Sequence, residues 1–227
     1  MRQKINIVWF KRDLRLSDHQ PLKNAFSNGL PTLLLYNFEP LLLEDAHYNE
    51  RHWRFVYQSL RDLNQQLDRF NSCVYLFKQK MQGLLEELHT QFEIINLFSH
   101  QEIGLNNTFE RDKAIKAWCQ HNQINWLESP TGAVIRGKKN RNNWNECWQQ
   151  TMQAPIAIPD WEHIKTVTLT HYQSPELPDN YTADDDNFQL GGPRLAREVM
   201  QSFFTERGKG YQKGISSPSL SRTHCSR

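Results

Sequence analysis

The chain has 227 residues, of which 38% are hydrophobic and 23% are charged, and its formal net charge is +2. This composition is typical of a globular protein with one sizeable core and a smaller remainder, and it excludes a strongly polyanionic or polycationic chain. It does not exclude nucleic-acid binding, because a balanced total can hide a basic face.

No apolar run approaches the ~20 residues needed to span a bilayer, and the N-terminal apolar stretch is too short and too soon broken by charge to be a secretory signal. The cysteines are far apart and include no C-x-x-C pair: Cys73, Cys119, Cys147 and Cys225. We therefore expect no metal site, no disulfide framework, no membrane partner and a cytoplasmic location.

Short apolar runs that are continuous rather than alternating predict buried strands at 5–10, 32–38, 73–77, 94–98 and 124–127. Amphipathic spacing between these runs predicts helices at 20–27, 50–70, 81–90 and 106–121. Strands that alternate with helices indicate an α/β fold, namely a doubly wound parallel five-stranded sheet with helices on both faces. We place this domain at residues 1–130.

The pattern changes after residue 130. Residues 142–152 predict a short helix, and 153–192 are rich in Pro, Asp, Asn, Thr and Gly, which is typical of a connector. We place the connector at 131–192. Pro193 then opens an amphipathic pattern that predicts a helix, and we expect 193–227 to begin a second domain that is incomplete in this chain.

The loop after the first strand, Lys11 to His19, is densely charged. Loops at the carboxyl ends of parallel strands line the ligand crevice of a doubly wound sheet. The loop contains neither G-x-G-x-x-G nor a Walker A sequence, which disfavours a standard dinucleotide or P-loop phosphate site.

The same loop resembles a known family. Val-Trp-Phe-Lys-Arg-Asp-Leu-Arg-Leu-Ser-Asp-His at 8–19 is similar to the opening signature of the DNA photolyase/cryptochrome family. Three further segments resemble that family in the same order along the chain. They are Phe-Ser-His-Gln-Glu at 98–102 followed by Glu-Arg-Asp at 110–112, Gly-Ala-Val-Ile at 132–135, and Gly-Lys-Gly-Tyr at 208–211 followed by Ile-Ser-Ser-Pro at 215–218 and Cys-Ser-Arg at 225–227.

The resemblance implies an N-terminal α/β domain that binds an antenna pigment of folate or deazaflavin type, and a helical domain that binds FAD. It implies that Glu102 lies near the pigment, and the strand ends add further candidates for the same crevice: Phe10, Lys11, Arg12, Asn37 and Phe38, with Arg51 at the start of the long helix. Tyr211, Cys225 and Ser226 match the start of the FAD-binding region.

The implied function is light-driven repair of pyrimidine dimers by a monomeric flavoprotein, a deoxyribodipyrimidine photolyase whose partner is damaged DNA. A basic stretch is a candidate for contact with DNA phosphates: Arg136, Lys138, Lys139 and Arg141. No catalytic residue is expected in this portion, so we do not expect the chain alone to repair DNA. Two alternatives stay open, a cryptochrome-type blue-light photoreceptor and a stand-alone small α/β nucleotide-binding protein.

Overall fold

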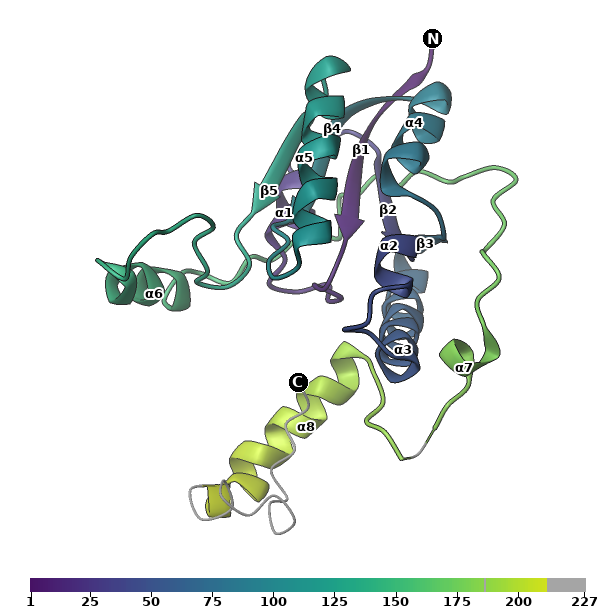
Figure 1. Cartoon of the computed structure of the whole chain (residues 1–227). Helices are drawn as coiled ribbons and strands as arrows, with labels where there is room; N and C mark the ends of the chain where they lie inside the picture. The colour runs from purple at the N-terminus through teal and green to yellow at the C-terminus, as the bar shows by residue number, and fades with distance from the viewer. Residues whose placement is uncertain (186, 212–227) are drawn as a thin grey trace.

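The computed structural model describes residues 1–185 and 187–211. Its centre is a parallel sheet with strand order β3-β2-β1-β4-β5, which Figure 1 shows with β1 in the middle. The strands are β1 (Gln3–Phe10), β2 (Thr32–Asn37), β3 (Val74–Phe77), β4 (Phe92–His100) and β5 (Asn125–Ser129). The chain moves to one side of β1 for two strands and to the other side for the last two, so the strand order reverses between β1 and β4. The expected α/β class and five-stranded parallel sheet are confirmed.

Helices lie between the strands, as the amphipathic spacing predicts. They are α1 (Gln20–Phe26), α2 (Pro40–Leu43), α3 (Glu50–Leu67), the 3-10 turn η1 (Asp68–Phe70), α4 (Met81–Gln91) and α5 (Asn106–His121). Beyond the sheet follow α6 (Trp144–Met152), α7 (Asp179–Thr182), α8 (Pro193–Thr205) and the 3-10 turn η2 (Arg207–Gly210). None of these helices is long and apolar enough to cross a membrane.

Alternation along β1 divides the apolar side chains between two cores, because successive strand residues point to opposite faces. Ile5, Ile7 and Trp9 pack with α4 and α5 on one face. Val8 and Phe10 pack with α1 and α3 on the other. The sheet is therefore covered on both sides, which explains why its strands are continuous apolar runs.

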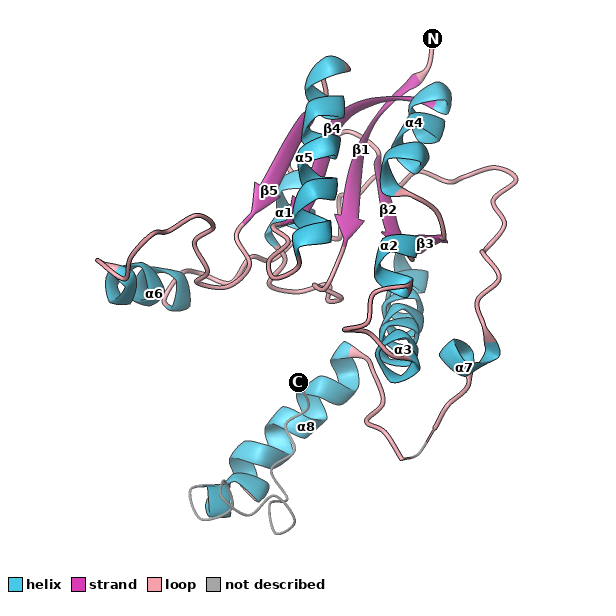
Figure 2. Ribbon diagram, in the orientation of Figure 1, coloured by secondary structure: helices cyan, strands magenta, loops and turns pink. Residues whose placement is uncertain are grey.

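The connector is mostly loop, as Figure 2 shows by its colour, yet it is fixed to the α/β domain at several points. Thr166 forms a parallel bridge with Thr32 at the start of β2. Tyr172 Oη accepts a hydrogen bond from the backbone N–H of Leu76 and donates one to the Leu76 carbonyl, each 2.9 Å long. These contacts hold the connector against β2 and β3 and lead the chain to α8.

The first turn of α8 lies against α3, while the rest of the helix extends away from the sheet (Figure 1). Gly191 has its backbone N–H 2.8 Å from the Gln58 side-chain oxygen, and Arg194 pairs with Asp62 of α3. The division at 130 and 192 stays a prediction, since packing of the connector onto the first domain does not by itself define a boundary.

Candidate crevice at the carboxyl ends of the strands

A cavity of about 1090 Å³ opens at the carboxyl ends of β1 and β2, beside α3 and the start of α8. This is the edge of the sheet at which doubly wound proteins bind ligands, near the strand-order reversal. Its volume is slightly above the range typical of small-molecule sites, about 300–1,000 Å³. Aromatic side chains and basic side chains share its lining: Trp9, Phe10, Tyr36, Tyr48, Trp53, Phe55 and Phe188, with Lys11, Arg12, Arg15, Arg51, Arg111 and Arg197.

Most of the side chains proposed from sequence for pigment contact meet in this cavity. Phe10, Lys11, Arg12, Asn37, Arg51 and Glu102 all line it. Phe38 does not line it; it is fully buried and packs edge-on against Tyr36 and Trp53. Phe38 therefore supports the wall from behind.

Arg111, at the start of α5, holds the acidic side chains of the crevice together. Its guanidinium donates a hydrogen bond to Glu39, which follows β2, and a 2.8 Å bond to Asp112. Its Nη2 also lies 3.7 Å from the Glu102 carboxylate. Four buried charges thus share one cluster, and removal of Arg111 would leave three carboxylates without their common partner.

Lys11 and Arg111 both lie over the indole of Trp9. The Lys11 Nζ is 4.2 Å from the ring centroid, and the Arg111 Cζ is 4.7 Å from it. Lys11 Nζ also lies 3.3 Å from Asp112 Oδ2, with both side chains buried. Burial lowers the pKa of Lys11, while the nearby Asp112 carboxylate opposes that change. The pair ties the end of β1 to α5.

Several wall residues were not foreseen from the sequence. Glu39 lies two residues after the end of β2, so the strand-end rule that indicated Asn37 and Phe38 also applied to it. Arg111 lies in the Glu-Arg-Asp segment that resembles the family, but it is not among the predicted site residues, because the sequence does not indicate that this part of α5 folds over β1. Phe188 and Arg197 come from the connector and α8, whose packing against α3 had no sequence signal.

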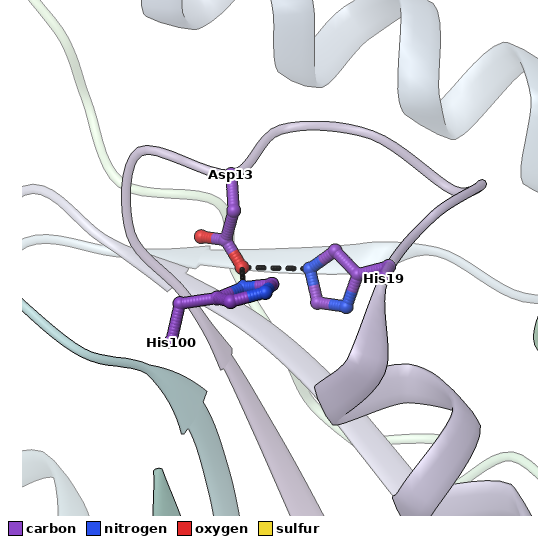
Figure 3. Close-up of side chains that lie close together, drawn as sticks. All are labelled: Asp13, His19 and His100. Carbon is purple, nitrogen blue, oxygen red and sulfur yellow. Dashed lines mark hydrogen bonds and ion pairs between the residues drawn. The ribbon is translucent and has the colours of Figure 1, made fainter. Parts of the chain in front are cut away.

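A buried polar cluster beside the crevice fixes the loop after β1 (Figure 3). Asp13 Oδ2 lies 2.7 Å from His19 Nε2 and 2.5 Å from His100 Nδ1, so two imidazoles converge on one carboxylate oxygen. The other oxygen of Asp13 accepts a 2.8 Å hydrogen bond from the Lys11 backbone N–H. The cluster joins the loop after β1, the start of α1 and the end of β4.

The tautomer of His19 follows from its second contact. The Leu22 backbone N–H donates to His19 Nδ1 at 3.1 Å and caps α1, so Nδ1 carries no proton and neutral His19 has its proton on Nε2, facing Asp13. Burial lowers the pKa of His19, and the Asp13 carboxylate opposes this. Burial alone would raise the pKa of Asp13, but the bonds with His100 and His19 bring it well below its usual range.

These three side chains are close enough together to be considered as metal ligands. A metal on His19 Nε2 would move the imidazole proton to Nδ1, where it would face the N–H of Leu22. Metal binding would therefore break the α1 cap, and the donor set fits a hydrogen-bonded cluster better than a metal site. The absence of a metal cofactor stays a prediction.

The remaining candidates lie away from the crevice. Arg136 pairs with Glu128 at 2.5 Å, and Lys138, Lys139 and Arg141 lie on the loop before α6. Tyr211 is exposed and packs edge-on against Phe203, with ring centroids 5.7 Å apart. Cys225 and Ser226 lie outside the described residues, so the FAD candidates are not brought together by the part of the chain that is described.

The sheet order defines a doubly wound α/β domain, and the crevice lies at the strand-order reversal, where proteins of this class bind their ligands. Comparison with known proteins is more specific. Residues 6–143 match the family model described as DNA photolyase. Cryptochrome DASH of Synechocystis sp. is 26% identical over 102 residues, which are 43% of this chain and 21% of that protein. Cryptochrome-1 of Macaca fascicularis is 28% identical over 116 residues, which are 49% of this chain and 19% of that protein.

Solved structures share the fold. The Synechocystis cryptochrome superimposes with a TM-score of 0.78 at 16% identity, covering 94% of this chain and 49% of its own. A class III photolyase from Agrobacterium tumefaciens gives 0.76 at 17% identity, covering 100% of this chain and 50% of its own. An archaeal photolyase from Sulfolobus tokodaii, solved with two FAD molecules, gives 0.63 at 15% identity, covering 86% and 46%.

The family match covers more than half of the chain, and the chain belongs to the DNA photolyase family, which includes the cryptochromes. The resemblance seen in the sequence is confirmed. The chain spans about half the length of these structural relatives, and the aligned segment covers about a fifth of the curated ones.

Proposed function

We propose that this chain is the pigment-binding α/β portion of a light-driven DNA photolyase, and that its crevice takes an antenna pigment of folate or deazaflavin type. The observation that supports this most directly is the lining of the cavity, whose aromatic and basic side chains suit a flat, anionic pigment. Aromatic rings provide apolar contact for a planar heterocycle, and the basic side chains at the mouth, Arg12, Arg51 and Arg197, suit an anionic tail.

FAD binding and repair of pyrimidine dimers are proposed for the whole protein to which this portion belongs. Support comes from the family match and from the photolyases that share the fold. The Sulfolobus relative was solved with two FAD molecules and interpreted in terms of a light-harvesting cofactor. The basic loop before α6 is the proposed DNA contact of this portion, with Lys138, Lys139 and Arg141 as the side chains that would contact phosphates.

A cryptochrome-type photoreceptor is the second candidate, because the curated relatives quoted above are cryptochromes. Both functions need a light-absorbing cofactor, so the crevice serves either. They differ in what the absorbed energy does, and dimer repair by the whole protein under blue light distinguishes them.

Pigment binding is tested by titrating the purified chain into folic acid and into riboflavin and following the fluorescence anisotropy or quenching of each. We expect saturable binding of at least one probe. Ala196 lines the cavity from the exposed surface of α8, so Ala196→Trp should fill the cavity without disturbing the core and weaken binding about tenfold or more.

The control is Gln82→Trp, which adds the same side chain at an exposed position of α4 on the far face of the sheet. It should bind like the unmodified chain. If neither probe binds, or if the two tryptophan variants behave alike, the crevice is not the pigment site.

A further inference from the structure

Glu39 has an acceptor oxygen that nothing in the described chain uses. The residue is 2% exposed and lines the crevice. One of its carboxylate oxygens accepts a hydrogen bond from Arg111, but Oε2 is buried and has no partner among the described residues. A buried carboxylate oxygen without a donor is unfavourable, so its presence in the wall of a large cavity indicates that a donor comes from a ligand.

Glu102 presents a second carboxylate to the same end of the cavity. Its side chain is also buried, with Oε2 3.7 Å from Arg111 and Oε1 2.9 Å from Arg12 Nε. Oε1 is within ion-pair distance of Arg12, but it does not accept a well-directed hydrogen bond from any described residue. Because Arg111 contacts both Glu39 and Glu102, one guanidinium fixes the two carboxylates relative to each other.

Burial raises the pKa of Glu39, and the Arg111 guanidinium opposes this change. A carboxylate that carries no proton can only accept hydrogen bonds, so the pair selects a ligand edge that donates them. A 2-amino-4-oxopteridine has such an edge, because its amino group and ring N3–H are adjacent. The equivalent edge of a flavin or deazaflavin has one N–H between two carbonyl oxygens, whose lone pairs face a carboxylate unfavourably. A site built around such bonds discriminates strongly between ligands that have the donors and ligands that lack them.

We propose that Glu39 is a ligand-binding, specificity-determining residue that, together with Glu102, selects planar heterocycles with two adjacent N–H donors on one edge. This inference rests on the proposed function, because it assumes that the pigment occupies this crevice. Within that function it favours a folate-type pigment over a deazaflavin-type one.

Pterin and lumazine are matched probes for this inference. Both are fluorescent pteridines, and they differ in carrying either an amino group or a carbonyl oxygen beside N3–H. We expect the unmodified chain to bind pterin roughly tenfold more tightly than lumazine or better. Glu39→Gln keeps the shape of the side chain but replaces one acceptor with a donor, so the preference should shrink to about threefold or less.

The matched control is Glu110→Gln, an exposed carboxylate on the same helix as Arg111. It should keep the full preference for pterin. Circular dichroism establishes that each variant is folded. If Glu39→Gln does not fold, Glu39→Asp gives the same test, because it keeps the charge beside Arg111 but retracts the carboxylate from the ligand.

The outcomes separate the two proposals. If both probes bind, Ala196→Trp abolishes their binding, and the Glu39 variant keeps the full preference, the role of Glu39 is wrong while the crevice remains the pigment site. Equal affinity of the unmodified chain for pterin and lumazine also overturns the role of Glu39. If no pteridine or flavin binds at all, the proposed function is overturned and the specificity proposal with it.

Discussion

At the scale of single residues, His19 connects helix capping to the crevice. Its Nδ1 caps α1 through Leu22, and its Nε2 faces Asp13, which in turn holds the backbone of Lys11 at the cavity wall. A histidine is suited to both contacts only while it is neutral, because a protonated Nδ1 can no longer accept the Leu22 N–H. The loop after β1 is therefore held by a histidine whose pKa is lowered by burial, which favours the neutral form that both contacts need.

This arrangement predicts acid sensitivity. The pKa of His19 is lower in the folded chain than in the unfolded chain. Below about pH 6.5 the unfolded state therefore binds a proton at this residue more readily than the folded state does, which favours unfolding. Asp13, whose pKa is also lowered, acts in the same direction at more acidic pH. The stability from His19 is therefore complete above its unfolded pKa and lost as the pH falls. Thermal melts between pH 7.5 and 5.5 should show a decrease of the order of 1 kcal/mol, or roughly 2–4 °C in Tm.

The matched variant is His19→Asn. An asparagine can accept from Leu22 through its Oδ1 and does not titrate, although its shorter side chain gives up the contact with Asp13. Its Tm should change less than that of the unmodified chain over the same pH interval. An identical pH dependence in the two proteins would show that His19 does not carry the effect.

At the scale of elements, α8 docks through two glycines that allow the backbone to approach α3 closely. A Cβ built on Gly191 would lie 2.1 Å from the Phe55 carbonyl oxygen and 2.7 Å from Ser59 Oγ. Gly192 has φ +126°, a conformation that side chains rarely adopt, and a Cβ there would meet the Asp62 carboxylate at 2.9 Å. Glycine at both positions is what allows α8 to form one wall of the crevice.

Gly191→Ala should therefore push the start of α8 away from α3. We expect a loss of about 1–3 kcal/mol in urea denaturation and faster hydrogen exchange in α8 than in the sheet. The control is Gly83→Ala in α4, where a Cβ meets nothing within 4 Å and the φ angle is ordinary. It should be neutral or stabilising by up to about 1 kcal/mol. Equal effects of the two substitutions would contradict the close-approach explanation.

The elements show what sequence alone determines. Strands and helices were predicted within a few residues, because continuous apolar runs and helical spacing are local signals. The rule that strand ends line the crevice brought Lys11 and Asn37 to one edge of the sheet, and the family resemblance added Glu102. Alternation along β2 would also have placed Phe38 in the core beside Tyr36. Arg111 and the α8 wall depend on long-range packing, which a single sequence does not encode in any local pattern.

At the scale of the whole molecule, the chain has a firmly attached connector and a loosely attached loop. Residues 157–194 contact the α/β domain repeatedly, through Asp18 to Ala157, Thr32 to Thr166, Arg54 to Asp185 and Asp62 to Arg194. The loop at 136–141 is largely exposed, and Arg136 connects it to the domain by pairing with Glu128. The two segments should differ in local stability.

Limited trypsin digestion tests this difference. We expect the first cuts after Lys138, Lys139 or Arg141, giving two fragments that still co-elute in gel filtration because the connector stays packed. Lys165 provides an internal control. Its carbonyl accepts a 2.8 Å hydrogen bond from the Thr32 N–H, so the peptide bond that trypsin would cleave after Lys165 is held against β2. Early cleavage after Lys165, or separation of the fragments without denaturant, would contradict the described packing.

The crevice takes its walls from both ends of the described chain, from Trp9 to Arg197. A molecule that touches both walls acts as a reversible cross-link, because it closes a chain loop of well over a hundred residues. Occupancy and the attachment of α8 are then linked: a ligand at a hundred times its Kd would add about 2.7 kcal/mol to the docked state if it bound that state alone. The rate at which α8 exchanges its amide hydrogens thus becomes a measure of ligand binding that requires no light.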